Sequence, residues 1–529
     1  MIDAYGFRKP TIPKCPSPNC SPSPLHRVGE VIQPPTPTME VLGWMIMGLQ
    51  GLMIVALGWI GGNMVTSPSL AQLPPQPVVS LATSPARQQQ KREQAQLLTP
   101  EYFNLQAYPV SDRTETHWRK LLWATAIIEP QDEFVGMTIR SILQLAQRPT
   151  LSMAQRRIVH MALQVGTQLY LSQSSGSHAF KAVFETILET NTNEQWVAMA
   201  VSALARTPDL GSQVGFTYPP QSHPDVGKWL ERIKVRFPHW RNNSSLYTTL
   251  VDIGQPKPSL PPLNDLFTWS IAPNQFHLYV LCRPNRFILC QAILKDPQGS
   301  WVREGDRLWS IPLMGRSLHH LTWNFGRGNT PQGIYRVEGT IPQPDTEFFR
   351  AYGLFPLVNL FVPWESGVNQ FLAGRKGYGF SSLTDYQSLL PPQWRSYYPI
   401  QQSYWAGKGG RGLFRIHGSG EPATFFTNNQ MENTSRLWNP AIGCLSALEL
   451  YDESGRLQRA DMPTLLQKLS SVGGSQFTGY LIVVDIPGDD TSPVSLSDLM
   501  GSLKTNPHSP MAKSPKILTS GSNQIDQRS

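Results

Sequence analysis

One histidine and one cysteine in the C-terminal half of the chain have the side chains that nucleophilic catalysis requires. His417 is followed by a glycine and Cys444 is preceded by one, both within the stretch 413–449. A thiol is a strong nucleophile only as the thiolate, and an imidazole within hydrogen-bond reach can take its proton. The two residues are 27 positions apart, so the fold has to bring them together. The pair indicates a cysteine nucleophile with a histidine base.

A turn motif lies upstream of this pair. Thr330, Pro331 and Gly333 form the sequence TPQG directly before a strand-like run that starts at Ile334. Proline fixes its own φ and glycine permits a positive φ, so the motif predicts a tight turn into the strand.

The order of these pieces resembles the catalytic domain of YkuD-type L,D-transpeptidases. In that family a TPxG turn is followed by a strand that ends in His-Gly and then by Gly-Cys, and the resemblance here covers roughly residues 267–486. It implies that Cys444 attacks the carbonyl carbon of a peptidoglycan stem peptide to form a thioester. It further implies that His417 activates the thiol and later protonates the leaving amine.

The resemblance also assigns supporting residues. Gly418 and Ser419 would orient the imidazole through their backbone. The backbone N–H groups of Gly443 and Cys444 would stabilise the oxyanion, a kind of contribution worth about 3 kcal/mol per donor. Thr330, Pro331 and Gly333 would support the site as the family's turn.

The sequence departs from the family motif around the cysteine. The family's second histidine is replaced by Ile442, the Ser or Thr before it by Ala441, and a frequent arginine by Ser446. These changes remove basic groups near the thiol. The cations that are candidates to replace them are Lys408, Arg411 and Arg436.

An apolar segment near the N-terminus predicts export. Residues 41–60 carry no charge, and about 20 such residues suffice to cross a bilayer as a helix. The nearest basic residues precede the segment, which places the bulk of the chain outside the cytoplasm. We expect a transmembrane helix or a signal peptide cleaved after Ala71, with Met39 as an alternative start.

Composition and periodicity divide the rest of the chain into segments. Apolar residues recur at three- and four-residue steps over the first half, with N-caps expected at Ser152 and Thr192, and they alternate over the second half. The expected architecture is multidomain: a disordered leader (1–38), a transmembrane helix or signal peptide (39–71), a linker (72–98), an all-α helical domain (99–255), a β-rich (α+β) YkuD-like catalytic domain (265–487) and a flexible tail (488–529). The run 317–325 is among the expected strands.

The chain has five cysteines, two of which fall in neighbouring apolar runs. Cys282 and Cys290 are not symmetric about the predicted turn 283–286, so we expect two buried thiols, with a disulfide as the alternative. An odd count outside the membrane leaves at least one thiol unpaired, and Cys444 is the candidate.

Several classes of function lack support. The net charge of +8 is scattered, without the basic runs of a nucleic-acid-binding protein. No zinc-type spacing of Cys or His occurs. His319 and His320 would face opposite sides of the expected strand and could not both bind one metal from it. We expect no metal and no cofactor.

These observations predict an exported L,D-transpeptidase-like cysteine acyltransferase in the periplasm, either anchored by its N-terminal helix or secreted, that acts on peptidoglycan. One alternative is a non-catalytic wall-binding or scaffold protein that keeps the fold. Another is a related peptidase or amidase that hydrolyses where a transpeptidase would transfer. The helical domain is expected to act as a spacer or to bind a protein partner.

Overall fold

The computed structural model describes most of the chain beyond residue 82. The described residues are 83–172, 177–206, 224–255, 258–343, 353–372, 374–380, 382–422, 425–426 and 437–503. The expected leader and the expected membrane segment lie outside them. Among the helices that are described, none combines the length and the apolar character needed to span a membrane.

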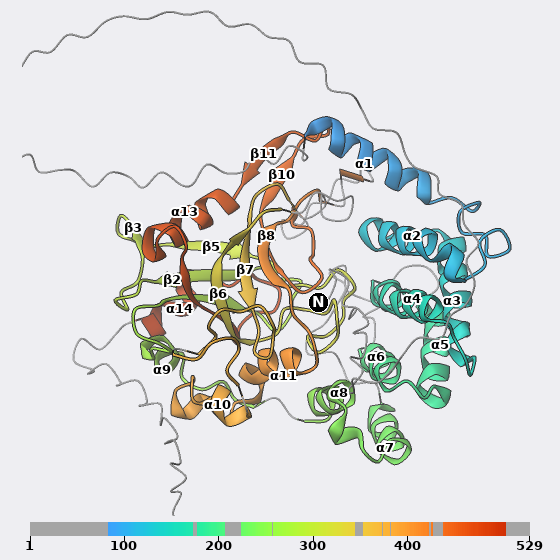
Figure 1. Cartoon of the computed structure of the whole chain (residues 1–529), viewed down its shortest axis with the longest axis horizontal. Coiled ribbons are helices and arrows are strands. Elements are labelled where there is room, and N and C mark those ends of the chain that lie inside the picture. The colour runs from blue at the N-terminus through green and yellow to red at the C-terminus, as the bar shows by residue number, and fades with distance from the viewer. Residues whose placement is uncertain are drawn as a thin grey trace, which may run out of the picture. The chain divides into compact units, whose positions relative to one another are not determined.

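The first part of the described chain is helical (Figure 1). Its α-helices are α1 (Ser84–Leu97), α2 (Glu115–Ile128), α3 (Glu133–Gln144), α4 (Met153–Leu171), α5 (Ser177–Thr190), α6 (Glu194–Leu204), α7 (Val226–Arg236) and α8 (Ser244–Gly254). The helix α4 contacts α2, α3, α5 and α6. It buries Ile158, Ala162, Val165 and Leu169, as the three- and four-residue steps predict.

Of the two helix caps predicted from the sequence, one is correct and the other lies one residue away from the predicted position. Ser152 caps α4 by accepting a hydrogen bond from the Gln155 backbone N–H, and the Gln155 side chain accepts one from the Ser152 N–H. The prediction of Thr192 was wrong, because Asn193 caps α6 by accepting from the N–H of Trp196. Threonine and asparagine are both good caps, so residue type alone could not choose between these neighbours.

The helix α1 lies inside the segment 72–98 that we expected to be a linker, and for this part the expectation was wrong. Arg87 on α1 is fully buried and pairs with Glu421 at 2.5 Å. Its guanidinium also stacks on the Tyr451 ring, 3.9 Å from the centroid. These distant contacts stabilise a helix whose polar composition resembles that of a spacer.

The second part is built on a mixed eight-stranded sheet. Its strands are β1 (Phe276–Cys282), β2 (Cys290–Lys295), β5 (Ser310–Leu313), β6 (Gly333–Ile341), β7 (Leu357–Phe361), β8 (Phe414–Gly418), β9 (Leu445–Ala447) and β12 (Thr478–Asp485). They are ordered β5-β2-β1-β12-β6-β7-β8-β9, and the β1–β12 and β8–β9 pairs are parallel. Met314, just beyond β5, exchanges two backbone hydrogen bonds with Ser446 of β9, so the sheet nearly closes on itself.

Short helices and hairpins surround this sheet. The helices are α9 (Leu263–Thr268), α10 (Leu383–Gln387), α11 (Gln402–Lys408), α13 (Met462–Gly473) and α14 (Leu496–Leu503). The hairpins are β3 (Arg303–Glu304) with β4 (Arg307–Leu308) and β10 (Glu449–Tyr451) with β11 (Leu457–Ala460). The described chain thus has a helical region and a mixed α+β sheet region, which is the coarse architecture that the sequence predicts.

Cys282 and Cys290 form a disulfide, so the expectation of two separate thiols was wrong. The error came from the position of the second strand, which begins at Cys290 and not near Phe287. Leu281 pairs with Gln291 across β1 and β2. The same antiparallel register places the two cysteines directly opposite each other.

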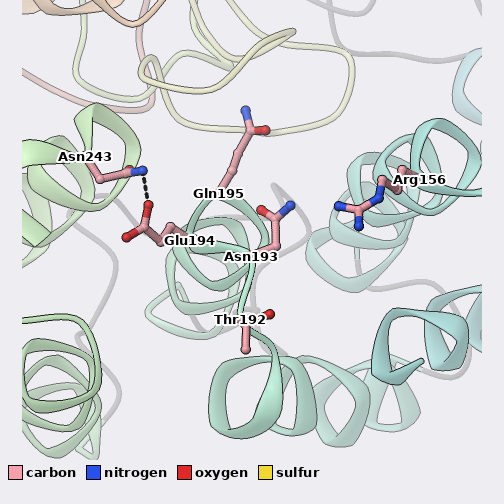
Figure 2. Close-up of a pocket in the computed structure, with 6 residues that line it drawn as sticks. All are labelled: Arg156, Thr192, Asn193, Glu194, Gln195 and Asn243. Carbon is pink, nitrogen blue, oxygen red and sulfur yellow. Dashed lines mark hydrogen bonds between the residues drawn. The ribbon is translucent and has the colours of Figure 1, made fainter. Parts of the chain in front are cut away.

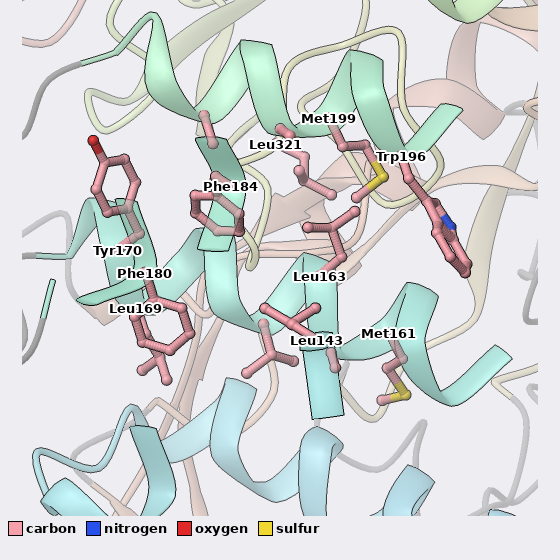
Figure 3. Close-up of a cluster of buried hydrophobic side chains, with 14 of the residues drawn as sticks. Leu143, Met161, Leu163, Leu169, Tyr170, Phe180, Phe184, Trp196, Met199 and Leu321 are labelled. Atoms are coloured by element: carbon pink, nitrogen blue, oxygen red, sulfur yellow. The ribbon is translucent and has the colours of Figure 1, made fainter. Parts of the chain in front are cut away.

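The run 317–325 contains no strand, contrary to expectation; it forms turns that pack against the helical region. Leu321 enters the apolar cluster of the helices (Figure 3). His319 hydrogen-bonds through Nδ1 to the Gln168 side chain at 3.1 Å. The segment therefore packs against the helices and does not form a strand of the sheet.

The expected flexible tail 488–529 begins with ordered structure. The helix α14 lies within it, and Leu499 on this helix is fully buried. Asp498 pairs with Arg283 at 2.7 Å. The polar composition concealed these two anchoring contacts, and the remainder of the tail lies outside the described residues.

Candidate functional site

The parallel strands β8 and β9 bring His417 and Cys444 together. His417 lies opposite Ser446, and Ile416 lies opposite Leu445, so Cys444 follows at the level just before β9. Neighbouring strands lie about 4.8 Å apart and each residue advances about 3.3 Å, which puts the Cα atoms of His417 and Cys444 roughly 8 Å apart. Their side chains are therefore within reach of each other.

His417 and its partner Ser446 project from the same face of the sheet. Ile416 and Leu445 point into the core beneath the sheet. Because successive residues of a strand alternate between faces, His417 and Ser446 point the other way, whereas Cys444 precedes β9 and its sulfur contacts the backbone at Leu413 and Arg415. Arg415, two residues before His417, shares this outer face.

The imidazole of His417 is held in one tautomer. The residue is 3% exposed, and its Nδ1 lies 2.6 Å from the carbonyl oxygen of Gly418. A carbonyl only accepts hydrogen bonds, so Nδ1 carries a proton, and in the neutral imidazole the lone pair is then on Nε2. This is the tautomer that a general base requires.

Gly418 and Ser419 fix the backbone that orients this imidazole. A Cβ atom at Gly418 would overlap the carboxylate of Glu449. The Ser419 hydroxyl donates to the Glu449 carbonyl at 3.2 Å and accepts from the Glu449 N–H at 3.0 Å. The backbone N–H of Ser419 donates to Ala447 at 2.7 Å, which ties the segment to β9.

Cys444 is a free and partly buried thiol. Its S–H donates to the Leu413 carbonyl, with 3.8 Å between sulfur and oxygen. Burial raises the pKa of Cys444, and the charges of Arg415 and Arg411 together with the Arg415 backbone N–H partly oppose this rise. The resting group is a neutral thiol beside two cations that favour the thiolate.

Of the cations considered from the sequence, Arg411 reaches the site. It donates to the carbonyl oxygens of Gly328 at 3.0 Å and Asn329 at 3.1 Å, and burial lowers its pKa to about 10. Lys408 instead lies over the Trp405 ring. Arg436 falls outside the described residues.

Arg415 was not predicted from the sequence, although a signal existed. It stands two residues before His417 on the same strand, so it projects from the same face as the histidine. Burial lowers the pKa of Arg415, and the charge of Cys444 opposes this. A search for basic residues at even spacing from the histidine would have found it.

Gly443 has a backbone that only glycine adopts readily. Its φ is 122°, and a Cβ atom there would overlap the Arg411 guanidinium. The glycine before the cysteine therefore lets the arginine approach the thiol closely.

The TPQG turn contacts the cysteine loop. The Thr330 hydroxyl donates to the carbonyl of Gly443 at 3.0 Å and lies 3.4 Å from that of Cys444. Pro331 accepts a hydrogen bond from the Tyr335 hydroxyl at 2.6 Å. Gly333 has a φ of 134°, and a Cβ atom there would overlap the Ser403 hydroxyl. The turn and the cysteine, far apart in sequence, thus form one site.

Ser446 is a further polar residue of this site that the sequence did not single out as functional. It lies directly opposite His417 and is fully buried. Its hydroxyl has no hydrogen-bond partner among the residues that the structure describes. A buried hydroxyl without a partner costs free energy.

The helical region forms one wall of the site. Ile442 and Cys444 pack against the apolar cluster of the helices, which also includes Leu318, Phe325 and Ala441. The thiol therefore lies where the two regions meet.

A separate open hollow of about 390 Å³ lies in the helical region (Figure 2). It is lined by Arg156, Thr192, Asn193, Glu194, Gln195 and Asn243. Asn193 and Asn243 cap the helices α6 and α8, and Asn243 also donates to the Glu194 carboxylate. None of the catalytic residues predicted from the sequence lines this hollow.

Within the described parts of the chain, no group of three or more His, Cys, Asp or Glu side chains is arranged to hold a metal ion. The chain matches no protein-family model, no curated protein and no solved structure. Any functional assignment therefore depends on the residues and the geometry given above.

Proposed function

We propose that this protein is an exported L,D-transpeptidase-like cysteine acyltransferase that acts on peptidoglycan stem peptides. One observation carries the proposal. The parallel register of β8 and β9 brings a free thiol, Cys444, next to the strand that carries His417, a histidine in the base tautomer. Arg411 and Arg415 lie beside the thiol and favour its ionised form.

The proposed reaction begins with transfer of the Cys444 thiol proton to Nε2 of His417. The sulfur then attacks the carbonyl carbon of a stem-peptide amide, and the carbonyl π electrons move to oxygen. The N–H of Cys444 is the candidate donor to this oxyanion. When the tetrahedral intermediate collapses, the C–N bond breaks, His417 returns the proton to the departing amine, and a thioester remains on Cys444.

The second half-reaction releases the acyl group. The amine of another stem peptide attacks the thioester carbon after losing a proton to His417, the C–S bond breaks, and the proton returns to the sulfur. An amide forms and the thiol is regenerated. Water in place of the amine gives a free carboxylic acid, so one site supports either transfer or hydrolysis.

Two features support an envelope location. The uncharged stretch 41–60 has the length of a membrane span. The disulfide between Cys282 and Cys290 is a bond that persists in oxidising compartments such as the periplasm. The proposal therefore places the sheet region outside the cytoplasm, where peptidoglycan is found.

The decisive experiment combines a reactive probe with a substrate. We expect the purified protein to gain the mass of one carbapenem on Cys444 and to change the muropeptide pattern of isolated peptidoglycan. The Cys444→Ala variant is expected to lose both activities completely and to unfold at the same temperature as the wild type. The enzyme assignment is wrong if the wild type is neither acylated nor able to alter the muropeptides.

The second candidate function is that of a non-catalytic wall-binding or scaffold protein. It is favoured by the raised pKa of Cys444 and by the hydrogen bond of its S–H to Leu413, both of which describe a thiol at rest. Binding of the Cys444→Ala variant to isolated peptidoglycan, without any change in muropeptides by the wild type, would favour this function.

The third candidate is a peptidase or amidase, and the muropeptide products distinguish it from a transpeptidase. Hydrolysis would yield shortened stems that end in a free carboxylate. Transfer would yield cross-linked dimers or exchanged terminal residues. The helical region, which borders Cys444, is proposed to contact a protein partner or to limit which acceptor reaches the thioester.

A further inference from the structure

The loop 283–289 carries a buried arginine toward the catalytic turn. The disulfide between Cys282 and Cys290 closes this loop at its base. Arg286 lies at its centre and is 7% exposed. A buried guanidinium requires partners of opposite charge or carbonyl oxygens, since burial of an unpaired charge is costly.

Arg286 finds these partners at the TPQG turn and at Asp485. Its Nη1 lies 2.7 Å from Oδ1 of Asp485, and its Nη2 donates to the Thr330 carbonyl at 3.4 Å. Asp485 in turn holds Gln332: the side chain of Gln332 donates to Oδ2 at 2.9 Å and accepts from the Asp485 N–H at 2.9 Å. Arg286 therefore contacts the first residue of the turn directly and its third residue through Asp485.

Thr330 connects the turn to the residue before the nucleophile. The Thr330 hydroxyl donates to the carbonyl oxygen of Gly443. This carbonyl shares a planar, trans peptide with the N–H of Cys444, so the N–H points in the opposite direction. Fixing the carbonyl thus aims the N–H that would donate to the oxyanion.

We propose that Arg286 is a positioning residue for the acylation of Cys444. From the disulfide-closed loop it holds Thr330, and Thr330 sets the orientation of the Gly443–Cys444 peptide. This inference rests on the proposed acyltransferase function and adds a residue outside the TPQG, His-Gly and Gly-Cys segments. It also gives Thr330 a specific task, which is to orient an oxyanion donor.

The inference separates two reactions of the same thiol. Acylation by a carbapenem passes through a tetrahedral oxyanion and needs the aimed N–H. Alkylation by iodoacetamide displaces iodide from a saturated carbon and forms no oxyanion. Loss of positioning should slow the first reaction and leave the second unchanged, whereas general unfolding or loosening would change both.

The test compares Arg286→Ala with Arg283→Ala in the full-length protein. Arg283 is a matched control because it is a buried arginine of the same loop, but its partners are Pro487 and Asp498. We expect Arg286→Ala to slow carbapenem acylation by about 10- to 100-fold, below the roughly 10²- to 10³-fold cost of losing an oxyanion donor outright. Arg283→Ala should acylate at the wild-type rate.

Thr330→Val provides a second variant that keeps the shape of the side chain and removes only the hydroxyl. It should reproduce the selective loss of acylation even if Arg286→Ala folds poorly. Arg286→Lys, which keeps the charge near Asp485, should recover part of the rate.

Each outcome of this comparison has a defined meaning. If Thr330→Val and Arg286→Ala are both acylated at the wild-type rate, the inference about Arg286 is overturned and the proposed function still stands. A parallel fall in acylation and alkylation would also overturn it, because it indicates a purely structural role. Absence of acylation in the wild type would overturn the proposed function and this inference with it.

Discussion

Histidines occupy two contrasting settings in this protein. His319 and His320 lie on the loop that follows β5 and contact the helical region, where His319 hydrogen-bonds to Gln168 and His320 pairs with Glu129 at 3.5 Å. Burial lowers the pKa of both. His417, by contrast, lies on a strand of the sheet, hydrogen-bonds to a backbone carbonyl and lies near a free thiol on the adjacent segment.

The difference lies in what each histidine faces. The side chains around His319 and His320 belong to both regions and tie them together. On the strand next to His417 the chain continues from a nucleophile, Cys444, whose thiol is influenced by the charges of two arginines. A perturbed pKa therefore does not identify a catalytic residue by itself; the chemistry of the neighbouring groups does. We therefore expect substitution of His417 to change the rate of the reaction, and substitution of His319 or His320 to change the stability of the fold.

The largest expected effect that distinguishes the settings comes from His417→Gln. Glutamine cannot take the thiol proton, and general-base catalysis typically contributes about 10²- to 10⁴-fold. We expect carbapenem acylation of Cys444 to fall by that factor with little change in the thermal unfolding temperature. Mass spectrometry over time and calorimetry measure the two quantities.

His320→Gln is the matched control for this change. It should lower the unfolding temperature, because it disturbs the contact with Glu129, and leave the acylation rate nearly unchanged. The comparison fails if the two variants show the same balance between lost activity and lost stability.

The second prediction concerns the pH dependence of stability. Burial lowers the pKa of His319 and His320 below 6.5, and that of His160 to about 4. Below pH 6.5 the unfolded chain binds protons that the folded chain excludes, so stability falls as the pH falls. The loss is about 1.4 kcal/mol per pH unit for each such histidine until its folded pKa is reached.

Several charged groups face this cluster and shape the curve. Arg316, Arg327 and Arg206 disfavour protonation of these histidines, whereas Glu129 favours it at His320. The pKa of Glu129 is itself lowered, so its own titration falls below the window from pH 6.5 to 5. Urea unfolding across this window should give a smaller slope for His319→Gln, and an unchanged slope would contradict the assignment.

The two settings were not equally visible in the sequence. The order of TPQG, His-Gly and Gly-Cys predicted that Thr330, His417 and Cys444 belong together only through its resemblance to the YkuD-type family. Alternation predicted most strands of the sheet. The helices α2 and α4 followed from apolar residues at helical spacing.

What the sequence concealed depends on contacts between distant segments. A strand was expected over 317–325, but Leu321 packs among helices instead. Arg87 and Asp498 anchor helices in segments that read as a linker and a tail. The Cys282–Cys290 disulfide depends on where β2 begins, and the boundaries of elements are the least reliable part of a sequence prediction.

The smallest expected effect concerns Ser446, which lies directly opposite His417. Its buried hydroxyl has no partner in the described part of the chain. Replacing it with alanine removes an unsatisfied group, so we expect stability to rise by about 1 kcal/mol.

Ser419→Ala serves as the control because Ser419 is an equally buried serine with two hydrogen bonds to Glu449. Its loss should cost about 1 kcal/mol of stability, since it leaves buried backbone groups unpaired. Chemical unfolding should therefore show a rise in stability for Ser446→Ala and a fall in stability for Ser419→Ala. If Ser446→Ala leaves the free energy of unfolding unchanged, the buried hydroxyl does not destabilise the folded protein, and the expected contrast with Ser419 is wrong.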